Sequence, residues 1–483
     1  MSSPTELLSI DIGSTYTKGI KIELDGDSCA VRTYAVSPTT VDDLSKGFVN
    51  VLATLTESPV SDLKTLTAGR EIRFSSSAKG GLKIVAIGLV PDLTLKVARL
   101  TACSAGGKLL KTFSYRLTSA DIREIESLNP DIVLLAGGSD GGNTVYPVEN
   151  ARKLAQSDLN SVIIYAGNRD LAEEVEEILS FKICEPAANV MPEIGNMNPD
   201  PARELIRKAF LEQIVSGKGL SEIVRAVGHN PKPTPLAMYE LIQAMGDADP
   251  KNGIMLVDMG GATTDVYSYC DSFAGEIGVV LRGIREPKLK RSVEGDLGMR
   301  VSAKSVGDSA QEFCADELDK LGYDLEEFNE YLEKVTLNPD YLPTPGDEKY
   351  LDFDRLIARS CLQYSVTRHA GIFKPTHTLE GRVYVQNGKD IRGIKRIIGT
   401  GGYLSRASDE KLWKNLGPGR NTANEDISLW PKEFEYWIDR HYLYPLLANI
   451  VEDYPKQAVK LAGESLVKIA GLNTGTSATE RLS

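Results

Sequence analysis

Cysteine and histidine, which build metal cages and disulfide frameworks, are scarce in this sequence. The chain of 483 residues has six cysteines and four histidines. The cysteines are scattered without a C-x-x-C pair, and no H-x-x-x-H or H-E-x-x-H arrangement occurs. The sequence therefore argues against a zinc cage, a disulfide framework or a histidine-built metal site. It predicts that the cysteines are small buried hydrophobic residues.

Long apolar runs and an excess of positive charge are also missing. No run reaches membrane-spanning length, and the N-terminus lacks a charged-then-apolar signal pattern. We therefore expect a cytoplasmic protein with no membrane contact. The formal net charge of -12 argues against a general nucleic-acid binder, which would need a basic face. Small-molecule or protein partners are expected instead.

Length and apolar content favour a protein of several domains. With 483 residues, 42% of them apolar, the chain is too long for one core. Between residues 79 and 142, short apolar strands alternate with amphipathic helices, which indicates an α/β layer with buried parallel strands. This layer ends in the loop LLAGGSDGGN (residues 134–143), which fits neither the Rossmann nor the Walker pattern. The loop either lines a nucleotide cleft or makes a tight strand-to-helix turn.

A hairpin with a polar tip is predicted by LLSIDIGSTYTK (residues 7–18), and a third antiparallel strand follows at 28–36. Asp11 ends the first strand and could hold a hydrated magnesium ion. The turn could bind a phosphate chain, because glycine permits close approach and hydroxyls, amides and a lysine can donate. The candidate residues are Gly13, Ser14, Thr15, Tyr16 and Lys18. The same pattern also fits an ordinary Asx-type turn.

A second candidate carboxylate lies in FKICEPAANVMPEIGNMNP, beginning at residue 181. A strand is expected to end at Glu185, with Pro186 in the first turn of a helix. Glu185 could then order an attacking water molecule, or it could be a surface helix cap. Further on, PKPTP (residues 231–235) indicates a stiff hinge or exposed loop between two halves.

The second half of the chain repeats the pattern of the first. In GIMLVDMGGATTDVYSY (residues 253–269), Asp258 takes the place of Asp11 between two strands. The second candidate phosphate loop consists of Gly260, Gly261, Ala262, Thr263 and Thr264. Two such hairpins facing each other would bind one phosphate chain from both sides. An accidental second copy in the same strand context is improbable.

Later stretches add a further glycine loop and several helices. EGDLGMR (residues 294–300) predicts a helix start, where Asp296 could cap and Gly295 could let the backbone approach a ligand. Helical sequence follows to about residue 378, and an amphipathic helix is expected at 454–469. The loop in IKRIIGTGGYLSR could let a base or ribose lie against the main chain. Its candidate residues are Gly399, Thr400, Gly401 and Gly402.

In their order, these stretches resemble the motifs of the superfamily of actin, heat-shock chaperones and sugar kinases. LLSIDIGSTYTK resembles the phosphate-1 motif, ICEPAANVMPEIG connect-1, LVDMGGATTDV phosphate-2 and IIGTGGYLSR the adenosine motif, while EGDLGMR occupies the connect-2 position more loosely. The resemblance implies an α/β protein with two ribonuclease-H-like ATPase lobes that close on ATP and Mg2+. The expected lobes are residues 1–235, with an insertion at about 37–128, and 236–475, with a helical insertion at about 305–380. Residues 476–483 would form a flexible tail.

The whole chain is similar to the MutL/GlmL family, accessory proteins of adenosylcobalamin-dependent mutases such as glutamate mutase. The resemblance implies a chaperone-like reactivating factor that uses ATP to expel damaged cobalamin from a mutase or aminomutase. It assigns Asp11 and Asp258 to magnesium, Lys18 to the phosphates and Glu185 to water, with slow hydrolysis to ADP. Ala262 departs from the third glycine common in heat-shock chaperones, and its Cβ would narrow the γ-phosphate pocket.

Three other functions are weighed against this one. A metabolite kinase of the same superfamily would need an aspartate base, for which Asp140 is the available candidate. A nucleotide-binding assembly protein would fit the acidic charge and the exposed insertion. An iron-sulfur activator would need clustered cysteines, which the sequence lacks.

Overall fold

The computed structural model describes residues 5–26, 28–40, 42–59, 62–77, 82–215, 219–273, 275–379, 381–418 and 426–474. The chain forms two compact units, one of Met1–Ala244 with Tyr444–Glu464 and one of Met245–Leu443 with Ser465–Ser483. The expected tail at 476–483 lies outside the described residues. No helix among the described residues is both long enough and apolar enough to cross a membrane.

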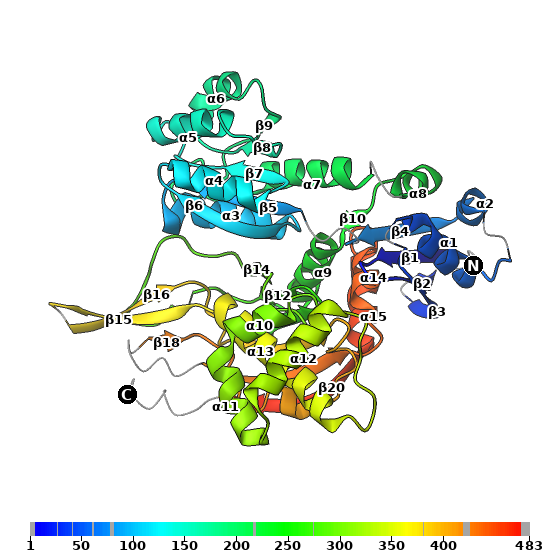
Figure 1. Cartoon of the computed structure of the whole chain (residues 1–483). Coiled ribbons are helices and arrows are strands. Elements are labelled where there is room, and N and C mark those ends of the chain that lie inside the picture. The colour runs from blue at the N-terminus through cyan, green and yellow to red at the C-terminus, as the bar shows by residue number, and fades with distance from the viewer. Residues whose placement is uncertain are drawn as a thin grey trace. The chain divides into compact units, whose positions relative to one another are not determined.

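The first unit is built on a five-stranded sheet with the order β10-β4-β1-β2-β3 (Figure 1). Strands β1 (Thr5–Ile12), β2 (Tyr16–Asp25) and β3 (Ser28–Pro38) form an antiparallel meander, as predicted. Parallel strands β4 (Glu71–Ser76) and β10 (Lys232–Pro233) extend the sheet beyond β1. Two helices, α1 (Leu44–Leu55) and α2 (Leu63–Thr67), lie between β3 and β4 in the chain. Helix α1 turns Phe48, Val51 and Leu52 into the core.

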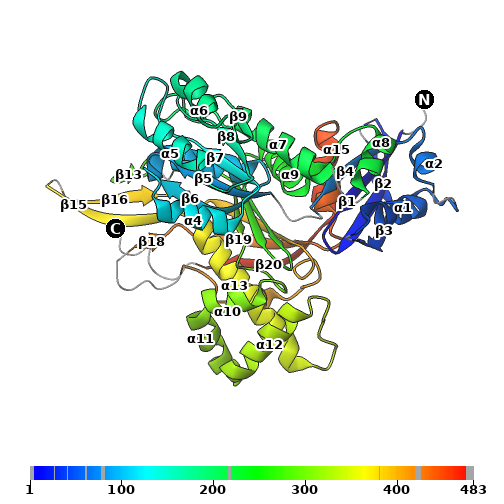
Figure 2. The ribbon, with the colours of Figure 1, turned by 45° about the horizontal axis from the view of Figure 1, so that its top comes forward.

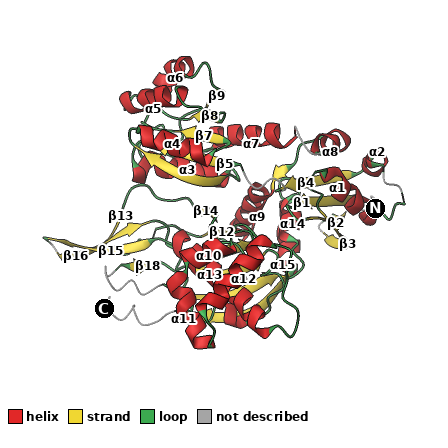
Figure 3. Cartoon of the chain, in the orientation of Figure 1, coloured by secondary structure: helices red, strands yellow, loops and turns green. Residues whose placement is uncertain are grey.

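A second sheet is inserted between β4 and β10, with the order β6-β5-β7-β8-β9 and only parallel pairs. Figure 3 shows its strands alternating with helices. The strands are β5 (Lys83–Gly88), β6 (Lys108–Ser114), β7 (Ile132–Leu135), β8 (Val162–Tyr165) and β9 (Cys184–Pro186). The helices are α3 (Lys96–Ser104), α4 (Ser119–Leu128), α5 (Val145–Ala155), α6 (Ala172–Ile178), α7 (Asp200–Val215) and α8 (Leu220–Val227). The α/β layer predicted at residues 79–142 is confirmed, and it continues through β8 to β9.

The second unit repeats the first sheet and adds one strand, in the order β14-β12-β11-β17-β19-β20. The strands are β11 (Gly253–Met259), β12 (Thr264–Tyr269), β14 (Leu289–Glu294), β17 (Ile394–Thr400), β19 (Glu433–Asp439) and β20 (Leu466–Asn473). Strand β11 pairs antiparallel with β12 and parallel with β17, as β1 pairs with β2 and β4. The internal repeat predicted from the sequence is therefore present in the topology.

Helices and a small sheet complete the second unit. Figure 2 shows α10, α11 and α12 gathered together. The helices are α10 (Ala303–Ser309), α11 (Gln311–Leu321), α12 (Leu325–Leu337) and α13 (Glu348–His369), whose apolar faces join the sheet in one core. The small sheet consists of β13 (Val279–Leu281), β16 (Gly381–Asn387), β15 (Ile372–Thr378) and β18 (Ile427–Ser428), in that order.

The C-terminal helices belong to the first unit. Helices α14 (Tyr444–Ala448) and α15 (Pro455–Glu464) lie within its second segment. The expected helix at 454–469 is too long, because the chain passes directly into β20, which pairs with β19. Asn449 Nδ2 donates to the carbonyl of Ile10 at 2.9 Å, so this segment is held directly on β1.

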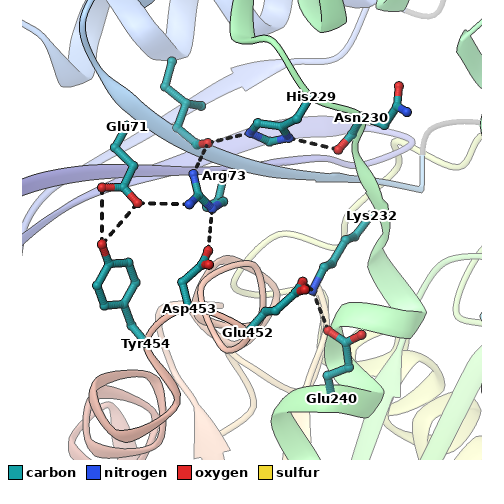
Figure 4. A network of polar contacts seen from close by, with 10 residues as sticks. Glu71, Arg73, His229, Asn230, Lys232, Glu240, Glu452, Asp453 and Tyr454 are labelled. Atoms are coloured by element: carbon teal, nitrogen blue, oxygen red, sulfur yellow. Dashed lines mark hydrogen bonds and ion pairs between the residues drawn. The ribbon is translucent and has the colours of Figure 1, made fainter.

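A polar network joins this returning segment to the first sheet (Figure 4). Arg73 on β4 pairs with Asp453 at 2.7 Å and with Glu71 at 3.0 Å. Lys232 on β10 pairs with both Glu240 and Glu452 at 2.7 Å. Residues 231–235 are therefore not an exposed hinge: β10 pairs with β4, and helix α9 (Thr234–Ala248) follows at once.

Candidate functional site

Asp11 lies at the end of β1 and is oriented by two hydroxyl groups. Its side chain is 2% exposed, and its Oδ1 accepts hydrogen bonds from Ser75 Oγ at 2.8 Å and Thr234 Oγ1 at 2.7 Å. Burial raises the pKa of Asp11, while the two hydrogen bonds and the charge of Lys18 oppose that rise. The carboxylate is thus fixed by β4 and by the start of α9, an arrangement suited to a group that must hold a metal ion or its water.

The turn after Asp11 is closed by its own backbone. Gly13 N donates to Tyr16 O at 3.1 Å, and a Cβ on Gly13 would lie 2.8 Å from that oxygen. Ser14 and Thr15, at the tip, are exposed. Lys18 is the register partner of Asp11 on β2. The turn therefore presents hydroxyl groups beyond the end of the strand pair.

The second hairpin closes in the same way. Asp258 precedes Gly260 by two residues, as Asp11 precedes Gly13, and Gly260 N donates to Thr263 O at 2.9 Å. The partner opposite the aspartate differs, because Asp258 faces Asp265 across the strands. Arg291 binds the carboxylate of Asp265 at 2.6 and 2.9 Å. The lysine of the first hairpin therefore has no counterpart at this register position.

The segment of residues 295–302 supports the second turn from its carbonyl side. Backbone N–H groups of Met299 and Arg300 donate to the carbonyls of Gly260 and Gly261 at 3.0 and 2.8 Å, and Ser302 Oγ donates to that of Ala262 at 2.7 Å. N–H and C=O point in opposite directions within a peptide unit. The amides that share these units therefore face away from the support, as an anion-binding loop requires.

The expected helix start at EGDLGMR is wrong. Residues 295–302 form turns, and α10 begins at Ala303. Asp296 is not a cap, because it accepts hydrogen bonds from Arg368 and Ser309 at 2.7 Å. Gly295 offers its carbonyl to Ser302 Oγ at 3.1 Å. The segment packs against the turn at residues 260–263 instead of starting a helix.

The glycine loop at residues 399–402, the candidate adenosine loop, lies next to this turn at the same edge of the sheet. Thr400 is the register partner of Asp258, and its hydroxyl donates to Asp439 at 2.9 Å. Gly401 has φ +99°, and a Cβ there would lie 2.2 Å from Met259 O. Gly399 packs against Tyr436, whereas a Cβ on Gly402 would meet no atom within 4 Å. The structure thus brings two of the predicted loops together.

Thr264 does not present its hydroxyl to a ligand. It is buried, and its Oγ1 donates to the carbonyl of Leu297 at 2.8 Å. Thr264 therefore fixes the start of β12 on the supporting segment. By contrast, Gly261 and Ala262 at the tip are exposed.

Glu185 does not belong to the sheet that carries Asp11. It lies on β9, an edge strand of the inserted sheet, and it pairs with Lys208 at 2.8 Å. The helix expected after Pro186 is absent from the structure: residues 187–199 are irregular, and α7 begins at Asp200. In the first sheet, the strand-proline-helix arrangement is formed by Pro233 and α9.

Asp140 has structural partners in the glycine loop after β7. Its Oδ1 accepts from Arg169 N at 3.1 Å and from Asn189 Nδ2 at 2.8 Å. Gly138 and Gly141 adopt φ +73° and +70°. These hydrogen bonds join the loop to the neighbouring segments, so the Asp140 carboxylate stabilises the loop conformation.

Thr234, Ser75 and Arg300 were not predicted as site residues. Arg300, behind the second turn, binds Asp354 at 2.8 and 3.0 Å, and Tyr331 donates to the same carboxylate at 2.8 Å. No short motif marks these residues. The one available signal was the internal repeat of the two halves. Because the sheet of the second unit is completed by β19, with α14 after it, the first half had to contain an equivalent strand and helix.

Comparison with known proteins fixes the family. The family model described as MutL protein matches residues 7–466. The chain is 36% identical to "Protein MutL" of Clostridium tetanomorphum over 487 residues, covering 96% of this chain and 99% of that protein. The chain belongs to the MutL protein family. The resemblance inferred from the sequence motifs is thereby confirmed.

Solved structures similar to this MutL-family chain include an acetone carboxylase (13% identity, TM-score 0.39, 92% of this chain and 70% of that one). Xylulose kinase of Lactobacillus acidophilus is 9% identical, with a TM-score of 0.33 over 98% and 94% of the chains. A glycerol dehydratase reactivase is 11% identical, with a TM-score of 0.33 over 95% and 100%. The two repeated sheets themselves show the expected ribonuclease-H-like, α/β architecture.

Each of the two candidate carboxylates is of a chemical kind that Mg2+ can use when it is bound with a nucleotide. Within the described ranges, no three His, Cys, Asp or Glu side chains are grouped so that they could hold a metal ion by themselves. Mg2+ commonly uses one or two carboxylates, with phosphate oxygens and water as its remaining ligands. Asp11 and Asp258, each beside a glycine turn, are the kind of donors that such binding needs.

Proposed function

We propose that this MutL-family protein is an ATP-dependent reactivating factor for an adenosylcobalamin-dependent mutase or aminomutase. Its work would be to release damaged cobalamin from the client so that intact cofactor can enter. The observation that carries the ATP part is the repeated turn, in which an aspartate is followed by a glycine whose N–H closes the loop on the third residue after it. The choice of client rests on the family resemblance.

ATP would use three loops of the chain. The turn at residues 13–16 and that at 260–263 would donate hydroxyls and amides to the phosphates, and Lys18 would supply positive charge. Asp11 and Asp258 would hold Mg2+ through its water, and the metal would offset phosphate charge. The glycines at 399–402 would let the nucleoside lie against the main chain. Binding ATP, and then losing its γ-phosphate, would switch the chain between two conformations.

The first experiment measures Mg-ATP binding by calorimetry in Asp11→Asn, Asp258→Asn and the double variant. Each single change should weaken binding about tenfold or more, since each removes a charge-assisted contact. If both aspartates act on one nucleotide, the two losses will not add. Unaltered binding in both single variants would end the ATP proposal.

The client half is tested separately with glutamate mutase and an aminomutase, each inactivated with cyanocobalamin. The wild-type protein with Mg-ATP should release the damaged cofactor and restore activity when adenosylcobalamin is added, and Asp11→Asn should not. If the protein binds ATP but releases no cobalamin, the proposed nucleotide site stands and the proposed reactivating role is excluded.

Hydrolysis would follow slowly, with Glu185 as the predicted water-positioning group. If that prediction holds, Glu185→Ala lowers ATP turnover about a hundredfold or more, the lower end of the range for a general-base contribution, without changing ATP affinity. Lys208→Ala is the matched control, because it breaks the same ion pair while keeping the carboxylate. Equal ATP turnover in wild type and Glu185→Ala would exclude Glu185 as the water-positioning group, so that its ion pair with Lys208 would be its only role.

A further inference from the structure

An anchored turn in the inserted domain exposes two large apolar side chains. Residues 180–183 connect α6 to β9, at the top of Figure 1. Phe181 is 98% exposed and Ile183 is 61% exposed. Aromatic side chains in such positions are unfavourable in water and are frequent binding anchors in interfaces. We call Phe181 and Ile183 the apolar knob.

The knob is held in place by the lysine between its two members. Lys182 is half-buried, and its Nζ donates to the carbonyls of Ser157 and Leu159 at 2.5 and 3.0 Å. The backbone is fixed as well: Lys182 N donates to Leu179 O, and Ile163 N donates to Ile183 O, both at 2.8 Å. A preorganised anchor loses little conformational entropy when a partner covers it.

Negative charge flanks the knob on the preceding helix. The first-turn glutamates Glu173 and Glu174 and the later Glu176 and Glu177 are all exposed. Glu174 has a counter-charge in Arg152 at 3.5 Å. Burial, followed by the charges of Glu176 and Glu185, raises the pKa of the Cys184 thiol to about 11. The negative potential of the helix therefore reaches β9.

The edge strand itself is not suited to adding a further strand. β9 has three residues and ends at Pro186, which has no N–H to donate. Recognition at this edge would therefore depend on side chains. A second copy of the chain is disfavoured, because a two-fold contact would bring the α6 glutamates of both copies together.

We propose that the apolar knob and the α6 glutamates dock the client enzyme, through an apolar pocket bordered by lysine or arginine side chains on the client. This proposal rests on the proposed function, because it names the surface through which the reactivating factor would hold its mutase. Phe181 supplies the buried anchor, and the glutamates set orientation and association rate.

Binding of the protein to glutamate mutase and to an aminomutase is measured by biolayer interferometry in the presence of Mg-ATP. Each mutase is immobilised and loaded with cyanocobalamin. Phe181→Ser should weaken binding about tenfold or more, and Ile183→Ser should weaken it less. Leu379→Ser is the matched control, because Leu379 is 108% exposed and lies directly after β15 in the other compact unit. Its affinity should equal that of wild type, and all three variants should bind ATP normally.

Several outcomes would overturn the docking surface. Equal loss in Phe181→Ser and Leu379→Ser, or no loss in either, removes the knob from the interface while the proposed function stands. Failure of the wild-type protein to bind either mutase, with ATP binding intact, defeats the client assignment and the docking surface together. A wild-type dimer that Phe181→Ser dissociates in sedimentation would assign the knob to a second copy.

Charge supplies an independent arm of the test. Glu173→Lys with Glu176→Lys should weaken client binding, and wild-type binding should fall as salt is raised through the range that screens exposed charges. Charge reversal that leaves affinity unchanged at low salt would contradict the basic-bordered pocket.

Discussion

Asp11, a proposed metal-binding residue, shows how a buried carboxylate lowers the stability of the fold. Its carboxylate is buried against Ser75 and Thr234, and burial raises its pKa despite both hydrogen bonds. A group whose pKa is raised by folding favours the folded state when protonated. This contribution is complete below the unfolded pKa and is lost as the pH rises through the folded pKa. Above its raised pKa, where Asp11 is ionised, the buried charge is therefore unfavourable for stability.

Asp11→Asn should accordingly stabilise the nucleotide-free protein while weakening Mg-ATP binding. The amide oxygen can still accept from Ser75 and Thr234, and the cost of a buried charge disappears. We expect a gain of about 1 kcal/mol at pH 7.5, or about 2–4 °C in Tm. The gain should shrink as the pH is lowered toward 4, measured by calorimetry. A variant less stable than wild type at pH 7.5 would contradict this.

Thr234 is a positioning residue for Asp11. Thr234→Val removes the hydroxyl that donates at 2.7 Å and so raises the pKa of Asp11 further. A hydrogen bond to a charged group contributes about 1.5–3 kcal/mol, so Mg-ATP affinity should fall at least about tenfold. The pH dependence of Mg-ATP affinity should shift toward higher pH.

Thr234→Ser is the matched control, because it keeps the hydroxyl. It should restore both the affinity and the pH profile. Loss of affinity in Thr234→Ser as large as that in Thr234→Val would mean that packing at the start of α9, and not the hydrogen bond, matters.

Among the elements, the turn at residues 260–263 and its supporting segment form one hydrogen-bonded piece. Three carbonyls of the turn accept from residues 299–302. A Cβ on Gly298 would lie 2.6 Å from Ala262 C and 2.7 Å from Gly261 O. These distances are too short for non-bonded atoms, so the backbone would have to move to accommodate a Cβ at this position.

Gly298→Ala should therefore displace the turn and weaken Mg-ATP binding about tenfold or more, with a loss of stability of about 1–3 kcal/mol from overpacking. Gly393→Ala is the control, because a Cβ there would meet no atom within 4 Å. Chemical denaturation and calorimetric titration of both variants test this. Equal ATP affinity in the two would show that the support is not needed for binding.

At the scale of the whole molecule, the nucleotide should stabilise the protein only with its metal. A ligand present at about 100 times its Kd adds about 2.7 kcal/mol to the folded state. We therefore expect Mg-ATP to raise Tm by several degrees, and EDTA to abolish most of that rise, in differential scanning calorimetry. An equal rise with ATP plus EDTA would exclude magnesium from the binding site.

The local elements of the two repeated sheets can be predicted from residues that lie close together in the chain. Short apolar-rich stretches ending at Asp11 and Asp258, each followed by a glycine turn, predict two hairpins, and both form with the same backbone closure. Such features depend on residues close in the chain, where strand periodicity and turn chemistry suffice. The family resemblance likewise followed from the order of short motifs.

The strands that complete each sheet from far along the chain could be identified only from the three-dimensional fold. β10 has two residues and pairs with β4 across the whole inserted domain, so no periodicity could reveal it. The same pairing brings Thr234 to Asp11, separated by 223 positions in the chain. Glu185 had the more conspicuous local pattern but belongs to another sheet. Local patterns specify elements, whereas long-range packing and hydrogen bonding decide which side chains meet.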